Sequence, residues 1–168
     1  MGAHDHKKHA ERDALVARCA VITVSDTKTA ETDTSGRAAE ELLKGAGHDV
    51  QRSLVPNAGV AGAVEAALRD HDLVLTVGGT GPSRRDRSVE AVRPFLEKEL
   101  PGFGELFRAL SAKEIGTAAV LSRALLGATS QGRVACCLPG SESAVRLALQ
   151  EILLPELRHL LWELRRYA

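Results

Sequence analysis

Short apolar runs separated by polar stretches dominate the chain and predict strands. Three runs are apolar almost throughout, which is typical of strands covered on both faces: residues 19–24, 72–77 and 133–138. Asp49–Val55 reads as a further strand, which ends at Pro56. Residues 118–128 are ambiguous, and we expect a weak strand and a turn there.

Between these runs, apolar residues recur with helical spacing. The stripes that predict helices are Ala39/Leu42/Leu43/Ala46, Val60/Val64/Ala67/Leu68, Phe103/Leu106/Phe107/Leu110, Val145/Ala148/Leu149/Ile152 and Leu157/Leu160/Leu161/Leu164. Ser88 is a candidate N-cap of a further helix that runs to about Glu99, and Pro155 can begin the last helix. We therefore expect an α/β fold with three layers, α/β/α, in which helices cover both faces of a mostly parallel sheet.

The length and composition favour one folded domain. The chain has 168 residues, 44% of them hydrophobic and 26% charged, which argues against disorder and suits a single domain. Residues 1–14 are polar and include His4, His6 and His9. We expect a solvated tail there rather than a metal site, because no further ligand is placed to close one. Residues 15–168 then form the domain.

The charge balance and the cysteines narrow the function classes. Lys and Arg number 22, as do Asp and Glu, so the net charge is zero, and no nucleic-acid partner is expected. No run approaches 18 apolar residues and the N-terminus lacks an apolar signal core, so we expect a soluble, cytoplasmic protein with no membrane partner. Cys19, Cys136 and Cys137 form no CxxC pair, and we assign them to buried strands.

Polar turns follow three of the predicted strands directly. Ligands of an open α/β sheet bind beyond the carboxyl ends of its strands, so these turns form the candidate site. They are Ser25-Asp26, the glycine loop at residues 78–81, and Pro139-Gly140-Ser141. Ser25, Asp26 and Ser141 are equally consistent with capping and with ligand contact. The hydroxyl-rich stretch 32–36, which includes Ser35, favours an N-cap cluster over an anion site.

The loop Gly78-Gly79-Thr80-Gly81 carries the strongest chemical signal. Glycines let backbone N–H groups approach an anion closely. Arg84, Arg85 and Arg87 place guanidinium groups where a phosphate would lie, and Asp86 among them suits a Mg²⁺ that bridges phosphates. The weaker alternative is an ordinary strand-to-helix turn with exposed arginines. Walker A, complete Rossmann and nucleophile-elbow motifs are all missing from the sequence.

Seven short tracts stand in a fixed order between about residues 18 and 164. They are Thr23-Val24-Ser25-Asp26, Glu31-Thr32-Asp33-Thr34-Ser35-Gly36, Gly78-Gly79-Thr80-Gly81 with Arg85-Asp86, Leu100-Pro101-Gly102-Phe103-Gly104-Glu105, Glu114-Ile115-Gly116-Thr117-Ala118, Leu121-Ser122-Arg123 and Leu138-Pro139-Gly140-Ser141. Each tract alone is weakly specific. Together they resemble the MoaB/MogA family of molybdenum-cofactor biosynthesis proteins, most closely its MoaB branch.

The resemblance implies a molybdopterin-binding fold assembled as a homotrimer or hexamer. It also implies Mg²⁺-dependent transfer of AMP from ATP to the terminal phosphate of molybdopterin. In that scheme Asp86 serves the metal and the transferring group, and Asn57 occupies the second catalytic position. The molybdopterin- or phosphate-binding residues implied by the resemblance are Ser25, Asp26, Ser35, Gly78, Gly79, Thr80, Gly81, Arg85, Ser88, Pro139, Gly140 and Ser141.

Three positions depart from the pattern of active relatives. Asn57 follows Pro56 where they carry an aspartate, so it cannot supply a second anionic metal ligand. Ser88-Val89 replaces Thr-Pro, and Ser141-Glu142 lacks a proline. These changes leave open a catalytically impaired protein that binds molybdopterin without efficient transfer. A third hypothesis is an unrelated nucleotide- or phosphosugar-binding domain that uses the same glycine loop.

Overall fold

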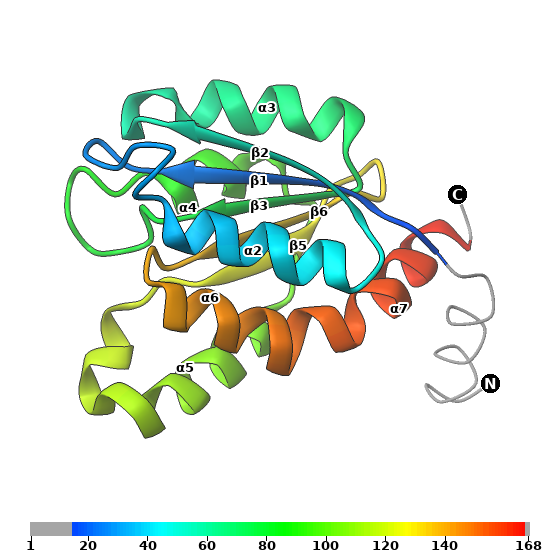
Figure 1. The fold of residues 1–168 in the computed structure, drawn as a ribbon. Coiled ribbons are helices and arrows are strands. Elements are labelled where there is room, and N and C mark those ends of the chain that lie inside the picture. Colours follow the sequence, from blue (N-terminus) through cyan, green and yellow to red (C-terminus); the bar gives the residue numbers. More distant parts are fainter. Residues whose placement is uncertain (1–14, 167–168) are drawn as a thin grey trace.

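Six strands of residues 15–166, the part of the chain that the computed structural model describes, pair in one mixed sheet (Figure 1). The order across the sheet is β2-β1-β3-β6-β5-β4. The strands are β1 (Arg18–Val24), β2 (Asp49–Val55), β3 (Leu73–Val77), β4 (Lys98–Glu99), β5 (Leu125–Ala128) and β6 (Val134–Leu138). Strands β2, β1, β3 and β6 pair in parallel, whereas β5 pairs antiparallel with both of its neighbours. The expected mostly parallel sheet is confirmed.

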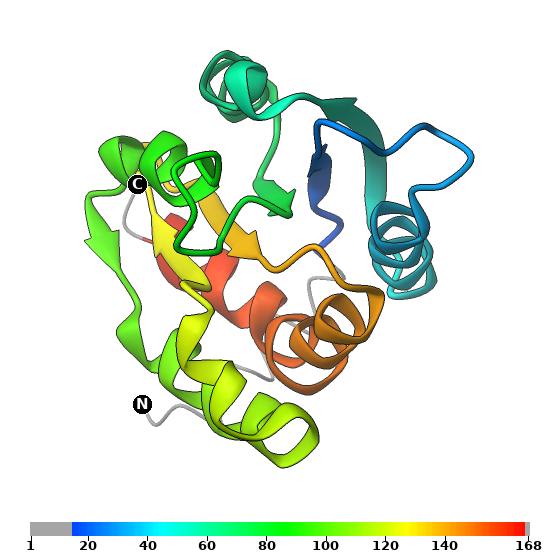
Figure 2. The ribbon, with the colours of Figure 1, turned by 90° about the vertical axis from the view of Figure 1, so that its left-hand side faces the viewer.

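Helices cover both faces of this sheet, as the hydrophobic pattern predicted. One face carries α2 (Thr34–Gly45), α5 (Pro101–Ile115), α6 (Glu142–Ala148) and α7 (Leu154–Arg165), and the other carries α3 (Val60–Asp70) and α4 (Ser88–Val92). Figure 2 looks at the carboxyl ends of the parallel strands and shows the three layers. Short turns of helix complete the chain: η1 (Asn57–Gly59), η2 (Arg93–Phe95), η3 (Gly116–Leu121) and η4 (Leu149–Leu153).

The core lies on both sides of the central strands, because successive strand residues point to opposite faces. In β3, Leu73, Leu75 and Val77 pack toward α2, α6 and α7, whereas Val74 packs toward α3 and α4. Every residue of β3 and β6 is buried. The three cysteines are free and buried on β1 and β6, which confirms their structural assignment. Burial raises the pKa of Cys19 to about 12, so this thiol stays protonated.

The strand order creates a switch point between β1 and β3. The chain leaves β1 toward α2 on one face of the sheet, and it leaves β3 toward α4 on the opposite face. The two loops therefore diverge at the carboxyl edge, where a crevice opens in folds of this kind. This edge positions the candidate site.

Two local predictions need correction or sharpening. The helix expected from Ser88 to about Glu99 ends at Val92, because Pro94 has no N–H to donate to the carbonyl of Glu90. The chain continues through η2 into the short strand β4. Residues 118–128, expected as a weak strand and a turn, form the end of η3 and strand β5.

The C-terminal helices are continuous rather than separate. Helix α6, the wide π-type turn η4 and α7 follow one another without a break, and Pro155 lies in the first turn of α7. Wide turns next to prolines accommodate the missing N–H without ending a helix. No helix within residues 15–166 is long and apolar enough to span a bilayer. The N-terminal tail with its three histidines lies outside the described residues.

Candidate functional site

Four loops meet at the carboxyl edge of the sheet. Ser25 follows β1 and donates its N–H to the carbonyl of Val55, at the end of β2. Gly78 follows β3 and donates its N–H to the carbonyl of Leu138, at the end of β6. A Cβ atom placed on Gly140 would lie 3.3 Å from the Cα of Gly78, so the loops after β3 and β6 are in contact. The three turns predicted as a site are therefore neighbours, and the turn after β2 joins them.

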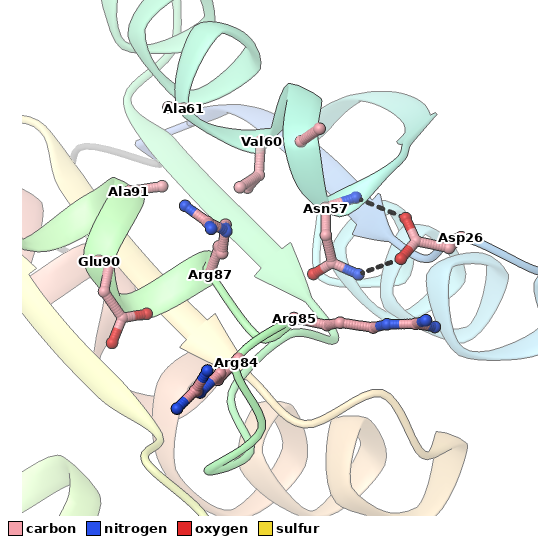
Figure 3. A pocket seen from close by; sticks show the side chains of 10 residues that line it. Asp26, Asn57, Val60, Ala61, Arg84, Arg85, Arg87, Glu90 and Ala91 are labelled. Atoms are coloured by element: carbon pink, nitrogen blue, oxygen red, sulfur yellow. Dashed lines mark hydrogen bonds between the residues drawn. The ribbon is translucent and has the colours of Figure 1, made fainter.

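A cavity of about 560 Å³ opens between the loops after β1, β2 and β3 (Figure 3). Its lining residues are Asp26, Asn57, Ala58, Val60, Ala61, Arg84, Arg85, Arg87, Glu90 and Ala91. Within residues 15–166, the side chains of Arg84, Arg85 and Arg87 form no hydrogen bond or ion pair with another residue. Arg85 extends toward the side of Asp26 (Figure 3). The cavity therefore offers three guanidinium groups to an anion.

Asp26 and Asn57 form a closed pair inside this cavity. The backbone N–H of Asn57 donates to Asp26 Oδ1 at 2.9 Å, and Asn57 Nδ2 donates to Asp26 Oδ2 at 3.1 Å. These two hydrogen bonds, together with the charge of Arg85, lower the pKa of Asp26. The other end of the amide, Asn57 Oδ1, is buried and accepts no hydrogen bond from any residue between 15 and 166. Asn57 thus favours the charged form of Asp26 and occupies both of its oxygens, while the oxygen of its own amide is buried without a partner.

Asp86 lies in an adjoining cavity rather than beside Asn57. This second cavity, of about 570 Å³, is lined by Pro82, Ser83, Arg84, Asp86, Arg87, Glu90 and Arg123. Asp86 Oδ2 accepts a hydrogen bond from the N–H of Ser83 at 3.0 Å, whereas no described residue donates to Oδ1. The two residues expected at catalytic positions therefore line different hollows. Arg84, Arg87 and Glu90 border both of them.

The donor set fits a magnesium ion held mainly by substrate. The described residues contain no group of three or more His, Cys, Asp or Glu side chains that could hold a metal. Asp86 has one free carboxylate oxygen, and Mg²⁺ commonly binds one or two carboxylates together with phosphate oxygens and water. Asp86 therefore offers one carboxylate oxygen to a metal ion, and a Mg²⁺ held there would take its other ligands from a bound phosphate and water.

The glycine loop directs the carbonyl groups of Gly78 and Gly79 toward Ser88, at the start of α4. Gly78 and Gly79 have φ of +100° and +71°, and a Cβ on Gly78 would collide with the carbonyl oxygen of Val24. Ser88 Oγ donates to the carbonyl of Gly78 at 2.6 Å, and the N–H of Ser88 donates to the carbonyl of Gly79 at 3.0 Å. Within the described chain, the N–H groups of Gly79, Thr80 and Gly81 have no acceptor. These N–H groups can each take a further acceptor, although Thr80 is buried and none of the three residues lines either cavity.

Two residues expected to contact a ligand are buried in the structure. Ser88 is fully buried and is the first residue of α4, so its hydroxyl acts on the glycine loop and not as an N-cap or a surface ligand. Ser35 is also fully buried, and its Oγ accepts a hydrogen bond from Lys28 Nζ at 2.6 Å. Neither residue lines either of these two cavities.

The remaining predicted residues cap or shape the turns. Ser141 is the N-cap of α6 and accepts a hydrogen bond from the N–H of Ala144. Ser25 Oγ accepts from the N–H groups of Thr27 and Lys28, which closes the turn after β1. Pro139 and Gly140 lead from β6 to α6. Of the residues predicted to bind or react, Asp26, Asn57 and Arg85 line the first cavity, and Asp86 lines the second.

Sequence reasoning missed Lys28 as a site residue. Lys28 Nζ donates to Ser35 Oγ and to the carbonyl of Gly140 at 3.1 Å, so it joins the loops after β1 and β6 to the start of α2. Arg123, noted only as part of a tract, contacts the glycine loop from 42 and 43 residues away. A lone lysine or arginine in a polar stretch has no local signature, and only its long-range partners reveal its role.

Comparison with known proteins agrees with this geometry. The family model described as "Probable molybdopterin binding domain" matches residues 20–159. A curated relative from Bacillus cereus, molybdenum cofactor biosynthesis protein B, is 45% identical over 99% of each chain.

Solved structures extend the same likeness to the fold. A crystal structure of molybdenum cofactor biosynthesis protein B is 47% identical, with a TM-score of 0.84 over 90% of this chain and 98% of that one. The tungsten cofactor synthesizing protein MoaB from Pyrococcus furiosus is 40% identical, with a TM-score of 0.80 over 89% of this chain and 98% of that one.

Proposed function

Because this chain belongs to the MoaB/MogA family of molybdenum-cofactor biosynthesis proteins, we propose that it binds molybdopterin and adenylylates it. In this reaction a terminal phosphate oxygen of molybdopterin attacks the α-phosphorus of ATP. The new P–O bond forms as the bond to the β-phosphate breaks, and pyrophosphate leaves. Two anionic substrates must therefore lie side by side.

The observation that carries the proposal is the pair of adjoining cavities that share Arg84 and Arg87. Two like-charged phosphates approach each other only where cations neutralise them, and transfer of a phosphoryl-type group depends mainly on positioning and charge. The two shared guanidiniums stand between the hollows, and neither is occupied by a carboxylate of the described chain. They would hold the attacking and departing phosphates close to each other.

Each remaining residue then has a defined task. Arg85 would neutralise phosphate on the side of Asp26, and the free N–H groups of the glycine loop would donate to phosphate oxygens. Asp86 Oδ1 would hold Mg²⁺, which supplies charge neutralisation on the triphosphate when bound. Lys28 would keep the loop after β6 at a fixed distance from the loop after β1.

Transfer of radiolabelled AMP from ATP to molybdopterin tests the proposal. We expect Asp86→Asn to lower the transfer rate about 10²–10³-fold, because an amide keeps the hydrogen bond with Ser83 but not the charge. Asp70→Asn, at the exposed end of α3, is the matched control and should leave the rate unchanged. Full rate in Asp86→Asn would exclude the role given to Asp86.

The Asp26–Asn57 pair favours a second candidate function, which is binding of molybdopterin without efficient transfer. The backbone N–H and the side-chain amide of Asn57 already occupy the two oxygens of Asp26, so this cavity lacks a pair of free carboxylates. Calorimetric binding of molybdopterin without AMP transfer would establish the binding protein over the enzyme. Absence of molybdopterin binding would contradict both functions.

We also propose that the chain assembles as a homotrimer or a hexamer. Large apolar side chains on α5 and η3 are exposed: Leu106 (48%), Ile115 (56%), Val120 (77%) and Leu121 (58%). A soluble monomer rarely leaves such side chains clustered in water, whereas an interface between copies covers them. Light scattering after size-exclusion chromatography should give three or six times the chain mass of 17.9 kDa. Val120→Asp should reduce it to the mass of one chain.

A further inference from the structure

We propose that Arg123 is a positioning residue that holds the glycine loop in its anion-binding form, with Glu90 holding Arg123. This inference rests on the proposed function, because it concerns how the loop presents its N–H groups to phosphate. Arg123 follows η3 and reaches back to the loop after β3. Its backbone N–H and its Nε both donate to the carbonyl of Thr80, each at 3.2 Å, and Nε also donates to the carbonyl of Gly81 at 3.1 Å.

Glu90 fixes the other side of the guanidinium. Arg123 Nη1 donates to Glu90 Oε1, and Nη2 donates to Glu90 Oε2 at 3.3 Å. This two-pronged pair lowers the pKa of Glu90, with the hydrogen bond from Arg123 as the main cause. Glu90 lies on α4, whose first residue Ser88 already holds the loop from below. Helix α4 and Arg123 thus both hold the glycine loop by hydrogen bonds to its carbonyl groups.

The geometry of the peptide unit shows how these contacts direct the N–H groups of the loop. In a trans peptide the C=O and the following N–H point in opposite directions, and the described chain contains no cis peptide bond. Ser88 holds the carbonyls of Gly78 and Gly79, which directs the N–H groups of Gly79 and Thr80 away from α4. Arg123 holds the carbonyl of Thr80, which directs the N–H of Gly81 away from Arg123.

The third peptide needs this support most. The peptide between Thr80 and Gly81 joins a loop in which glycine occupies both neighbouring positions of Thr80, so its rotation meets little steric resistance. Without Arg123 the carbonyl of Thr80 could turn toward a bound phosphate and repel it. The positive charge alone does not explain the contacts, since Glu90 already neutralises the guanidinium.

Binding of Mg-pyrophosphate and Mg-ATP to the full chain tests the proposal, measured by calorimetry and by the ¹⁵N–¹H amide shifts of Gly79, Thr80 and Gly81. In the wild type we expect both ligands to shift these amides. Arg123→Ala should weaken pyrophosphate binding at least about tenfold and abolish the shift of Gly81. Arg123→Lys should not restore either, because one ammonium cannot hold two carbonyls and a carboxylate in the plane of a guanidinium.

Two further variants distinguish the positioning of the glycine loop from an effect of charge and from an effect on folding. Glu90→Gln removes a negative charge beside the cavities, so a purely electrostatic role predicts tighter pyrophosphate binding. If Glu90 instead positions Arg123 against the glycine loop, pyrophosphate binding should become weaker. Gln has the same size as Glu, so Glu90→Gln should fold and still tests the proposal if Arg123→Ala does not fold. Arg93→Ala, which breaks an exposed pair with Glu99 outside both cavities, is the matched control and should bind as the wild type does.

The outcomes are distinguishable. Wild-type affinity in Arg123→Lys, an unchanged Gly81 amide shift in Arg123→Ala, or tighter binding in Glu90→Gln would overturn the positioning role and leave the proposed function intact. If the wild-type chain binds neither Mg-pyrophosphate nor Mg-ATP, the proposed function fails and the positioning role fails with it.

Discussion

The two ends of the parallel strands treat charge in opposite ways. At the amino end, Asp72 is nearly buried, with its side chain 8% exposed, and it pairs with Arg133 at 2.9 Å and Arg165 at 2.7 Å. It also accepts a hydrogen bond from the N–H of Arg18. At the carboxyl end, three arginines of the loop after β3 lie exposed without a carboxylate partner in the described chain.

The difference shows which charged residues of a chain with zero net charge can bind an anion. A buried carboxylate must be paired, because an uncompensated charge away from water is costly. Exposed arginines need no partner for stability, since water screens them, but together they create a positive potential that attracts anions. The net charge of zero therefore hides two clusters of arginines. Those at the amino end share the carboxylate of Asp72 and hold the fold, and we call this the matched end. Those at the carboxyl end have no such partner and can bind an anion, and we call this the unmatched end.

The largest expected effect is on the matched end. Asp72→Ala should lower the free energy of unfolding by about 3 kcal/mol, because it leaves Arg133 and Arg165 without their partner and releases the end of α7. Urea titration followed by the fluorescence of Trp162, the single tryptophan, measures it on the same helix. Asp70→Ala, exposed and two residues away, is the control. An equal loss in both variants would contradict the comparison.

The next effect concerns the unmatched end. Replacing Arg84, Arg85 and Arg87 by Gln should weaken pyrophosphate binding about 30-fold, or about 2 kcal/mol, with little change in unfolding free energy. The corresponding triple Lys variant keeps the charge and should lose less. Calorimetry at two salt concentrations checks both, because the remaining affinity should depend less on salt. A large loss of stability in the Gln variant would show that these arginines hold the fold.

A smaller effect is expected where the carboxyl end does contain a closed pair. Asn57→Asp places a second carboxylate against Asp26 in place of the Nδ2 donor, which raises the pKa of one of the two acids. We expect the melting temperature to fall by a few degrees without metal and to recover with Mg²⁺, whose affinity should rise about tenfold. Asn57→Ser is the control without added charge. If the native chain only binds, this change should also raise AMP transfer.

The smallest effect lies at the amino end, at His48. Its Nδ1 accepts the N–H of Ala17 at 3.2 Å, and burial, followed by the nearby Arg158, lowers its pKa from the usual 6.5. The unfolded chain then binds more protons below about pH 6.5, so the free energy of unfolding falls as the pH drops through this value toward the folded-state pKa. Above pH 6.5 the contribution is fully present.

Unfolding curves between pH 5 and 8 measure this slope. In His48→Gln, whose amide oxygen can accept the same N–H, part of the pH dependence should disappear. An identical slope in the wild type and the variant would mean that another group dominates the titration.

Most of the fold could be predicted because its signals are local. The three apolar runs and Asp49–Val55 became strands within one residue of their expected limits, since both faces of the sheet are covered and β-branched residues pack well there. The helix expected to run to Glu99 failed because Pro94 outweighed the pattern around it. Tertiary pairing with β5 then made Lys98–Glu99 a strand.

The residues of the candidate site also divide into those that local sequence predicts and those that only tertiary packing brings together. Sequence alone determined that glycines, arginines and an aspartate follow β3, and that polar turns follow β1 and β6, because residue type and local spacing carry that information. Only the tertiary structure decided that Asn57 closes on Asp26 and that Asp86 lines a separate cavity. It also decided that Arg123 reaches the glycine loop and that Lys28 joins the loops after β1 and β6. Such contacts join residues far apart in the chain, and their partners are chosen by how the layers pack.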